Sequence, residues 1–235
     1  MQLFFDKNIK QNDKQFTFDK VESKHIVRVL RKKEGDILFI TNGNGFLFKS
    51  KIIVANDKKC LIEIIEEKFT KKQFDYSLHI AIAPTKNNQR LEWFLEKATE
   101  IGISQITPII CDNSERKVIK TERLEKVLIS AMKQANRLYL PKLNETISFK
   151  NFIKQDLQSD LFIAHCEETN KKLFKNELKK NQKLTILIGP EGDFSLKEIE
   201  LALKNKYIAV SLGNSRLRTE TAGVVATHSV AFLNE

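Results

Sequence analysis

The sequence has few cysteines and histidines, and their scarcity excludes two classes of protein. Its three cysteines and four histidines are scattered, with no Cys-x-x-Cys pair: Cys60, Cys111, Cys166, His25, His79, His165 and His228. This spacing argues against a disulfide framework and against a structural zinc site, so we expect no metal. We interpret each of these side chains as a buried thiol or a singly hydrogen-bonded imidazole.

Long apolar runs are absent as well. No segment approaches the roughly 20 apolar residues that span a bilayer. The N-terminus, MQLFFDKNIK, has too short an apolar stretch and becomes charged too soon to be a secretory signal. We therefore expect a cytoplasmic protein that does not enter a membrane.

Three common site motifs are missing from the chain. There is no G-x-x-x-x-G-K-[ST], which disfavours a P-loop nucleotidase. There is no G-x-G-x-x-G, which disfavours a dinucleotide fold and an ordinary Rossmann-type methyltransferase. The absence of G-x-S-x-G disfavours a hydrolase with a nucleophile elbow.

The charge that is present is mostly positive. Forty Lys and Arg stand against thirty Asp and Glu, which gives a net charge of +10 and a pI near 9.4. Such a balance suits a polyanionic partner, although lysine-rich genomes inflate it. Between residues 116 and 142 only Glu122 and Glu125 oppose eight basic residues: Arg116, Lys117, Lys120, Arg123, Lys126, Lys133, Arg137 and Lys142. A solvated helix face is the alternative, but this local excess favours contact with phosphate.

We predict two domains with a boundary near residue 70. The first 70 residues hold short apolar runs separated by turn signals, and Asn42-Gly43-Asn44-Gly45 predicts a hairpin. The segment SKHIVRVLRKKEGD (23–36) predicts one short helix that ends near Gly35. Short strands with tight turns favour a small antiparallel barrel.

Residues 71–235 alternate strand and helix, which predicts an α/β domain with a mostly parallel sheet covered on both faces. We expect strands at 77–83, 105–110, 160–167, 184–189 and 208–213. We expect helices at 87–102, from about Thr121, from Ser195 and at 221–233. Pro108 suggests that its strand lies at an edge or ends there.

A first unusual turn, Gly189-Pro190-Glu191-Gly192, follows a predicted strand. Ligands of open parallel sheets bind beyond the carboxyl ends of the strands, where this turn lies. Ser195 and Glu198 form a capping box that fixes the start of the next helix. The two glycines let a ligand approach the main chain, whereas a simple tight connection would need only one.

The second unusual turn is SLGNSRLRTETAGVVA (211–226). Thr219 or Thr221 can cap the final helix. Arg216 and Arg218, followed by Glu220, indicate either an anion-binding corner or a salt-bridged cap of the final helix.

Together, IGPEGDFSLKE and LGNSRLRTETA closely resemble the paired signatures of the bacterial ribosomal RNA uracil-N3 methyltransferases, in the SPOUT superfamily of knotted methyltransferases. The resemblance extends through HIVRVLR (25–31), EKATEIGISQITP (96–108) and AMKQANR (131–137), so it covers nearly the whole chain. It implies a PUA-like antiparallel β-barrel over residues 1–70 and an α/β domain with a deep C-terminal trefoil knot over 71–235. It further implies S-adenosylmethionine (SAM) as cofactor, a homodimer, and methylation of N3 of one uridine in 16S ribosomal RNA.

The resemblance also assigns cofactor residues by position. The first cofactor loop consists of Gly189, Pro190, Glu191 and Gly192. The second consists of Leu212, Gly213, Leu217, Arg218, Thr219, Glu220, Thr221 and Ala222. The third wall of the site is expected at Ala164 and His165.

Three positions depart from the family pattern. Asp193 stands where the family usually has another glycine, which puts a carboxylate near a cationic sulfonium or the RNA. Arg216 replaces a usually apolar residue, and Lys133 stands where a glutamate is usual.

Uracil N3 carries a proton that must leave before or during methyl transfer, so the reaction needs a base or a cation that stabilises the anion. Our hypothesis is that Arg218 stabilises charge near the reacting base, while Glu220 orients it or accepts the proton. The alternative is that Arg218 pairs with Glu220 or caps the last helix.

For RNA contacts we predict six basic residues: Arg28, Arg31, Lys86, Arg116, Lys133 and Arg137. Two alternatives to ribosomal RNA methylation remain open at this point. One is a non-catalytic RNA-binding or ribosome-assembly protein that keeps the fold. The other is a methyltransferase of the same fold that acts on transfer RNA.

Overall fold

The structure is a computed structural model that describes residues 2–71, 74–168 and 170–235. The chain divides into two compact units, Met1–Gln73 with Met132–Leu140, and Phe74–Ala131 with Pro141–Glu235. We predicted one boundary near residue 70; in addition, the short segment 132–140 is grouped with the first unit. None of the helices in the described ranges has the length and apolarity that a membrane crossing requires.

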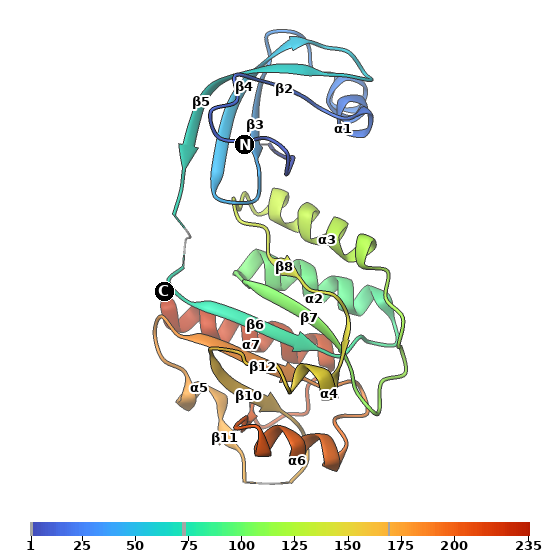
Figure 1. Cartoon of the computed structure of the whole chain (residues 1–235), viewed down its shortest axis with the longest axis vertical. Helices are drawn as coiled ribbons and strands as arrows, with labels where there is room; N and C mark the ends of the chain where they lie inside the picture. The colour runs from blue at the N-terminus through green and yellow to red at the C-terminus, as the bar shows by residue number, and fades with distance from the viewer. Residues whose placement is uncertain (1, 72–73, 169) are drawn as a thin grey trace. The chain divides into compact units, whose positions relative to one another are not determined.

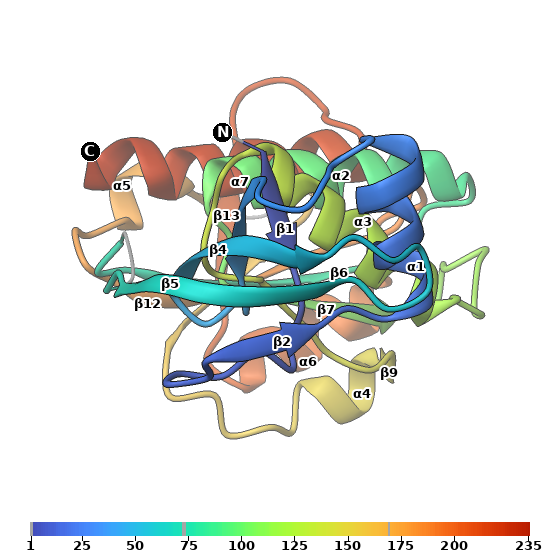
Figure 2. The same ribbon diagram turned by 90° about the horizontal axis from the view of Figure 1, so that it is seen from above.

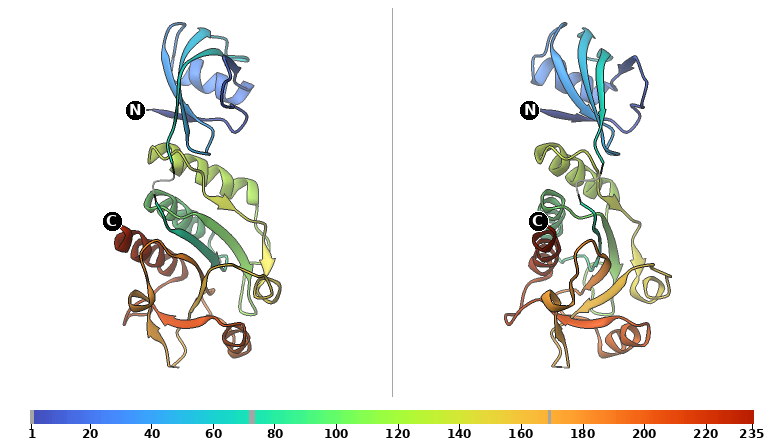
Figure 3. Two further views of the ribbon diagram at one scale, coloured as in Figure 1. Left: turned by 60° about the vertical axis from the view of Figure 1, so that its left-hand side comes forward. Right: turned by 90° about the vertical axis from the view of Figure 1, so that its left-hand side faces the viewer.

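The first unit is built on a five-stranded sheet in the order β1-β3-β4-β5-β2 (Figure 3). Its strands are β1 (Leu3–Phe5), β2 (Gln15–Thr17), β3 (Ile37–Thr41), β4 (Phe46–Val54) and β5 (Leu61–Phe69). The predicted hairpin at 42–45 is confirmed, because it joins the antiparallel strands β3 and β4. Alternate apolar side chains of these strands, among them Phe4, Ile40, Phe48 and Ile62, form the core of this unit.

Two predictions for this unit are wrong in detail. The sheet is not wholly antiparallel, because β1 pairs parallel to β3, and the long connection between them can make the crossover that parallel pairing needs. The helical segment begins earlier and ends earlier than predicted, as α1 (Lys20–Lys24) and the π-helical turn η1 (His25–Val29). The Asp19 side chain caps its start, and Arg31 takes a left-handed φ of 55°, which ends the helix well before Gly35.

The second unit contains an eight-stranded sheet in the order β11-β13-β10-β12-β6-β7-β8, with β9 also paired to β7 (Figure 1). All of these pairs are parallel, which confirms the predicted sheet type. The strands are β6 (Ser77–Ile82), β7 (Gln105–Ile110), β8 (Lys142–Leu143), β9 (Ile147–Ser148), β10 (Asp160–Ala164), β11 (Lys172–Leu173), β12 (Lys183–Ile188) and β13 (Ile208–Ser211).

Helices cover both faces of this sheet. In Figure 2, α2 (Asn88–Ile101) and α7 (Thr219–Asn234) lie on one face, and α4 (Phe149–Phe152) and α6 (Leu196–Lys204) lie on the other. The remaining helices are α3 (Thr121–Gln134) and α5 (Phe174–Glu177). Helix α7 packs very closely, because a Cβ added at Gly223 would lie 2.5 Å from the Phe94 ring of α2. Gly223 is therefore a packing glycine.

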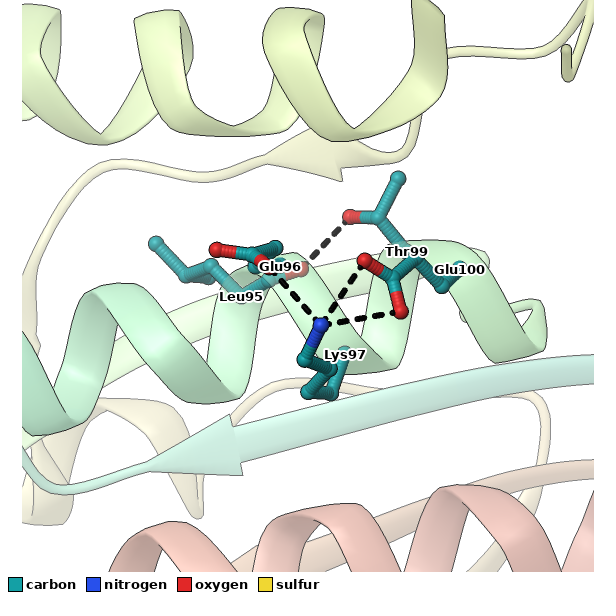
Figure 4. A network of polar contacts seen from close by, with 5 residues as sticks. All are labelled: Leu95, Glu96, Lys97, Thr99 and Glu100. Carbon is teal, nitrogen blue, oxygen red and sulfur yellow. Dashed lines mark hydrogen bonds and ion pairs between the residues drawn. The ribbon is translucent and has the colours of Figure 1, made fainter. Parts of the chain in front are cut away.

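Helix α2 shows how one helix serves a buried and a solvated side. Leu91, Phe94, Leu95 and Ala98 are buried on one stripe. On the outer side the Lys97 ammonium lies 2.8 Å from Glu96 and 3.0 Å from Glu100 (Figure 4). The buried Thr99 hydroxyl donates to the Leu95 carbonyl at 2.7 Å, so its polar group is satisfied within the helix. Gly102, at φ 132°, ends the helix as predicted.

Pro108 was predicted to mark a sheet edge or a strand end. The edge is wrong, because β7 pairs with β6 on one side and with β8 and β9 on the other, and the strand continues past the proline to Ile110. The proline lies between the two short pairings on the outer side, after Ile106 pairs with β8 and before Ile109 pairs with β9. A residue without an N–H group can occupy that gap without breaking the ladder.

Candidate functional site

A cavity of about 640 Å³ lies at the carboxyl ends of β10, β12 and β13 and beside the start of α7. The predicted cofactor residues line this cavity, except Gly192, Glu220 and Thr221: Ala164, His165, Gly189, Pro190, Glu191, Leu212, Gly213, Leu217, Arg218, Thr219 and Ala222. The parallel sheet explains the convergence, since its strands end at the same edge and deliver their loops there.

The three exceptions have local explanations. Glu220 is buried and forms an ion pair with Arg90 of α2. Gly192 faces Asn113 instead of the cavity, and a Cβ added there would lie 3.3 Å from the Asn113 Cβ. The Asn113 amide donates to the Gly192 carbonyl at 3.1 Å. Thr221 lies further into the first turn of α7 and is half-buried.

The first loop (residues 189–194) is fixed by many hydrogen bonds. The Glu191 carboxylate accepts the Lys86 amide at 2.9 Å. The capping box predicted at Ser195 and Glu198 is present, and α6 begins at Leu196 directly after it. Glu198 is 2% exposed, and its second carboxylate oxygen accepts the Asp112 amide at 2.9 Å. The loop is therefore held from both of its ends.

Asp193 has an unusual backbone in this loop. Its φ is 62°, in the left-handed region that favours glycine. One carboxylate oxygen accepts the Cys166 amide at 2.6 Å, just beyond β10. The Asp193 side chain therefore connects the first loop to the third wall of the cavity.

The second loop (residues 212–218) is open by contrast. The Ser211 hydroxyl bonds Gly213, which has a φ of 150°, and residues 213–216 and Arg218 are exposed. Within the described residues, neither Arg216 nor Arg218 makes a side-chain hydrogen bond or ion pair. The two guanidinium groups are therefore available to an anionic ligand.

The structure also bears on the alternative roles of Arg218 and Glu220. Arg218 is the N-cap residue of α7, but its side chain makes no capping hydrogen bond. Glu220 is 7% exposed, and its ion pair is with Arg90 of α2, at 3.8 Å. Neither capping by Arg218 nor an Arg218–Glu220 ion pair is therefore present.

Threonine capping of α7 was predicted, and it is also absent. Thr219 is the first residue of the helix and not its N-cap. Its hydroxyl donates to the Gly189 carbonyl at 3.0 Å. Thr219 thus connects the end of the second loop to the first loop.

Two buried side chains in or near this site carry polar atoms without a hydrogen-bond partner among the described residues. His165 is 6% exposed, and neither ring nitrogen has a hydrogen-bond partner within the described residues. Burial, together with the nearby Lys171 charge, lowers the pKa of His165, so the imidazole is neutral at pH 7. One carboxylate oxygen of Glu220 is likewise buried without a partner. A buried polar atom without a hydrogen-bond partner destabilises the fold unless a ligand or a water molecule supplies that partner.

The predicted RNA-contacting residues of the first unit differ in whether their side chains already interact with other residues of the protein. Arg28 pairs with Asp57 at 2.8 Å but is 68% exposed. Arg31 lines a groove of about 520 Å³ with Lys32 and Lys33. The Lys133 ammonium lies 3.4 Å from the Glu22 carboxylate and over the Phe4 ring. Arg137 lies in the segment 132–140.

Lys86 and Arg116 lie together in the second unit. The Arg116 guanidinium donates two hydrogen bonds to the Lys86 carbonyl, at 3.2 and 2.7 Å. The Lys86 ammonium lies 2.9 Å from the Glu115 carboxylate, and its side chain is 74% exposed. The pair therefore forms an exposed basic corner beside the first loop.

Sequence reasoning missed three residues of the site. Arg90 and Lys171 carried no motif, and Arg90 meets Glu220 only because α2 packs against α7. Cys166 was predicted to be a buried thiol, which is wrong, because the residue is exposed and its backbone amide donates to Asp193. Among the described residues, no group of His, Cys, Asp and Glu side chains could hold a metal ion.

Comparison with known proteins agrees with this site. The family model for an RNA methyltransferase domain matches residues 72–231, and that for an RNA methyltransferase PUA domain matches residues 18–65. The chain is 34% identical over 222 residues to "Ribosomal RNA small subunit methyltransferase E" of Buchnera aphidicola, covering 90% of this chain and 86% of the relative. The Bacillus subtilis protein of the same name is 27% identical over 251 residues and covers 100% of this chain, with 98% of the relative covered.

Solved structures show the same fold. A probable rRNA-methyltransferase from Porphyromonas gingivalis superposes with a TM-score of 0.92 at 39% identity and covers 100% of this chain and 98% of its own. A Neisseria gonorrhoeae ribosomal RNA small subunit methyltransferase E bound to S-adenosyl methionine gives 0.84 at 22% identity, with coverage of 100% and 98%. The chain therefore belongs to the ribosomal RNA small subunit methyltransferase E family and is an RNA methyltransferase with a PUA domain.

Proposed function

We propose that this chain methylates N3 of one uridine in small-subunit ribosomal RNA and holds SAM in the cavity between its two loops. The observation that carries the proposal is the cavity itself, because both signature turns line it. The names of the relatives support the choice of ribosomal over transfer RNA. Because the proposed substrate is ribosomal RNA, the cytoplasm is the expected site of action.

The chemistry of the lining fits SAM. A volume of about 640 Å³ lies within the range of roughly 300–1,000 Å³ that is common for cofactor pockets. Ile188, Val210 and Leu217 offer apolar contact to a purine, and the glycines expose backbone groups that can read its edge. The lining also carries both charges, with Glu191 and Asp193 against Lys171, Arg216 and Arg218, as a ligand with an ammonium, a sulfonium and a carboxylate requires.

When bound, SAM supplies a methyl group that its sulfonium already activates, so the protein must mainly position the uracil and manage its N3 proton. Arg218 is exposed at the cavity, and its guanidinium makes no side-chain interaction within the described residues. A free guanidinium at this place can stabilise the negative charge that develops on the uracil when N3 loses its proton. We assign that role to Arg218.

Glu220 is the proposed acceptor or orienting group for the proton. Arg90 holds one side of its carboxylate, and the other oxygen has no partner in the described chain. That oxygen is buried and Glu220 does not itself line the cavity, so an intervening water would have to connect it to the base.

The finer features of the family fold are proposed for this chain as well. The path of the C-terminal segment supports a deep trefoil knot, because the chain crosses from β12 to β13 beyond β10 and then returns as α7 against β6 and α2. A homodimer is supported by large apolar side chains left exposed on α2 and α7, where Trp93 is 43% and Phe232 69% exposed. Sedimentation velocity of the native chain and of Phe232→Ser tests the dimer.

RNA contact is proposed for Arg28, Arg31, Lys86, Arg116, Lys133 and Arg137. Exposure supports Arg28 and Lys86 most directly, and the Lys32 and Lys33 side chains beside Arg31 enlarge that basic surface. Lys133 is less available than Arg28 and Lys86, because its ammonium already contacts Glu22 and Phe4 and its side chain is 25% exposed.

Labelled SAM and three substrates test the proposal: protein-free small-subunit RNA, assembled small subunits and bulk transfer RNA, all from cells that lack the modification. Nuclease digestion and mass spectrometry should then find one 3-methyluridine in the ribosomal samples and none in transfer RNA. Methylation of transfer RNA alone would favour the alternative substrate. No methylation together with no calorimetric SAM binding at millimolar concentration would favour a non-catalytic RNA-binding protein.

A further inference from the structure

Asp193 occupies a position in the first loop that would suit glycine better. Its amide donates to the Pro190 carbonyl at 2.9 Å, which closes a tight turn, and its φ of 62° is left-handed. Aspartate tolerates this conformation better than most residues, but glycine adopts it without steric cost. The side chain therefore has to contribute something that a glycine would not.

Part of this contribution is a connection across the cavity wall. One Asp193 carboxylate oxygen accepts the Cys166 amide at 2.6 Å, and the other accepts the Phe194 amide at 2.8 Å. The side-chain amide of Asn113 fixes the backbone of the loop by donating to the Asp193 carbonyl at 3.1 Å. The carboxylate is thus fixed in place by two donors and cannot swing away from the cavity at little cost.

The second contribution of the Asp193 side chain is its negative charge. Asp193 and Cys166 both line the cavity, and the carboxylate lies close enough to His165 to act on its pKa, in the direction of raising it. Lys171, whose ammonium donates to the His165 carbonyl at 3.1 Å, is the positive group on the same wall. The remaining charged residues of the lining are Glu191 in the first loop and Arg216 and Arg218 in the second.

Methyl transfer changes the charge of the ligand in this cavity. The carbon–sulfur bond breaks, its electron pair stays on sulfur, and the sulfonium becomes a neutral thioether, while uracil N3 gains the methyl group and loses its proton. A fixed carboxylate on the wall therefore attracts the cofactor more strongly than the product S-adenosylhomocysteine. We propose that Asp193 is a specificity-determining residue that makes the cavity prefer the sulfonium cofactor over its thioether product; this inference rests on the proposed function.

Two substitutions separate the charge from the connection. In Asp193→Asn the amide oxygen can still accept the Cys166 amide and keep the connection across the wall, but the Phe194 amide loses its acceptor and the negative charge is lost. In Asp193→Gly both are lost, while the turn keeps a residue that suits its backbone. Glu200→Gln is the matched control, because it removes an exposed carboxylate of α6 that does not line the cavity.

The dissociation constants of SAM and S-adenosylhomocysteine are measured by calorimetry for the native chain and all three variants. For Asp193→Asn we expect the preference for SAM to fall about fivefold, as for a partly exposed charge pair, with little change for the product. For Asp193→Gly both ligands should weaken. In the Glu200→Gln control, both constants should stay at their native values.

An unchanged ratio of the two constants in Asp193→Asn, or an equal loss for both ligands, would overturn the inference. Product inhibition in the methylation assay gives a second readout, since the variant should be inhibited more strongly by S-adenosylhomocysteine relative to its KM for SAM. If the native chain binds neither ligand, it is the proposed function that fails. If the native chain binds both ligands and methylates RNA, but Asp193→Asn leaves the ratio of the two dissociation constants unchanged, only the proposed role of Asp193 fails.

Discussion

The two loops that line the cavity differ in how firmly the protein holds them. The first loop has buried residues, Gly189 and Pro190, and is fixed by Lys86, Asn113 and the capping box of α6. The second loop is exposed over residues 213–216, and neither of its arginine side chains makes a hydrogen bond or ion pair within the described chain. The difference suggests a division of labour, in which the first loop provides a rigid surface for the cofactor and the second presents charges to the RNA.

The largest expected effect comes from the open loop. Arg218→Ala should lower the single-turnover rate at saturating SAM and RNA by about 10²–10³-fold, because a preorganised donor to developing negative charge is lost. SAM affinity should change much less. The matched control is Arg123→Ala, which removes an exposed arginine that pairs with Glu92 outside the cavity. An unchanged rate for Arg218→Ala would remove this residue from catalysis.

Loss of the buried carboxylate in the capping box should come next. Glu198→Ala leaves the amides of Asp112 and Ser195 without their acceptor, which should cost about 2 kcal/mol of unfolding free energy. Urea unfolding followed by the fluorescence of Trp93, the only tryptophan, reports on the second unit. Glu200→Ala on the exposed side of α6 should stay within about 0.5 kcal/mol. Equal losses for the two variants would show that the first loop is not held in this way.

The hydrogen bond between the loops gives a smaller effect. Thr219→Val keeps the shape of the side chain but removes the donor to the Gly189 carbonyl. The loss should be about 1 kcal/mol, seen as weaker SAM binding by about fivefold and a slightly lower unfolding free energy. Thr221→Val is the control, because Thr221 does not line the cavity. If both valines behave alike, the two loops are not coupled through Thr219.

The smallest effect tests whether the open loop reaches RNA. Arg216→Gln should lower the slope of log binding constant against log salt by roughly 0.7 to 0.9, as one phosphate contact is lost. The affinity of Arg216→Gln for RNA at moderate salt should fall only modestly. Lys204→Gln at the end of α6 should leave the slope unchanged. A native slope for Arg216→Gln would place this arginine on the cofactor side of the cavity or away from both ligands.

The same contrast explains what the sequence could predict. The end of the first loop could be predicted, because Ser195 and Glu198 interact within one helical turn and such a local interaction has a recognisable sequence spacing. The contacts that complete the site were not readable, since Arg90 reaches Glu220 from a helix far away in sequence. Asp193 was visible as an oddity, yet its partner, the Cys166 amide, has no side-chain signature at all. Two-residue strands such as β8 and β9 are too short to show a period.

Ribosomal RNA from a strain that lacks the gene provides the most direct test of the central claim. Mass spectrometry of its small-subunit RNA should show one 3-methyluridine missing compared with the parent strain. Expression of the native chain should restore this nucleoside, and expression of Arg218→Ala should not. An unchanged set of methylated uridines in the deletion strain, or the loss of a methyl group from another base, would contradict the proposed activity.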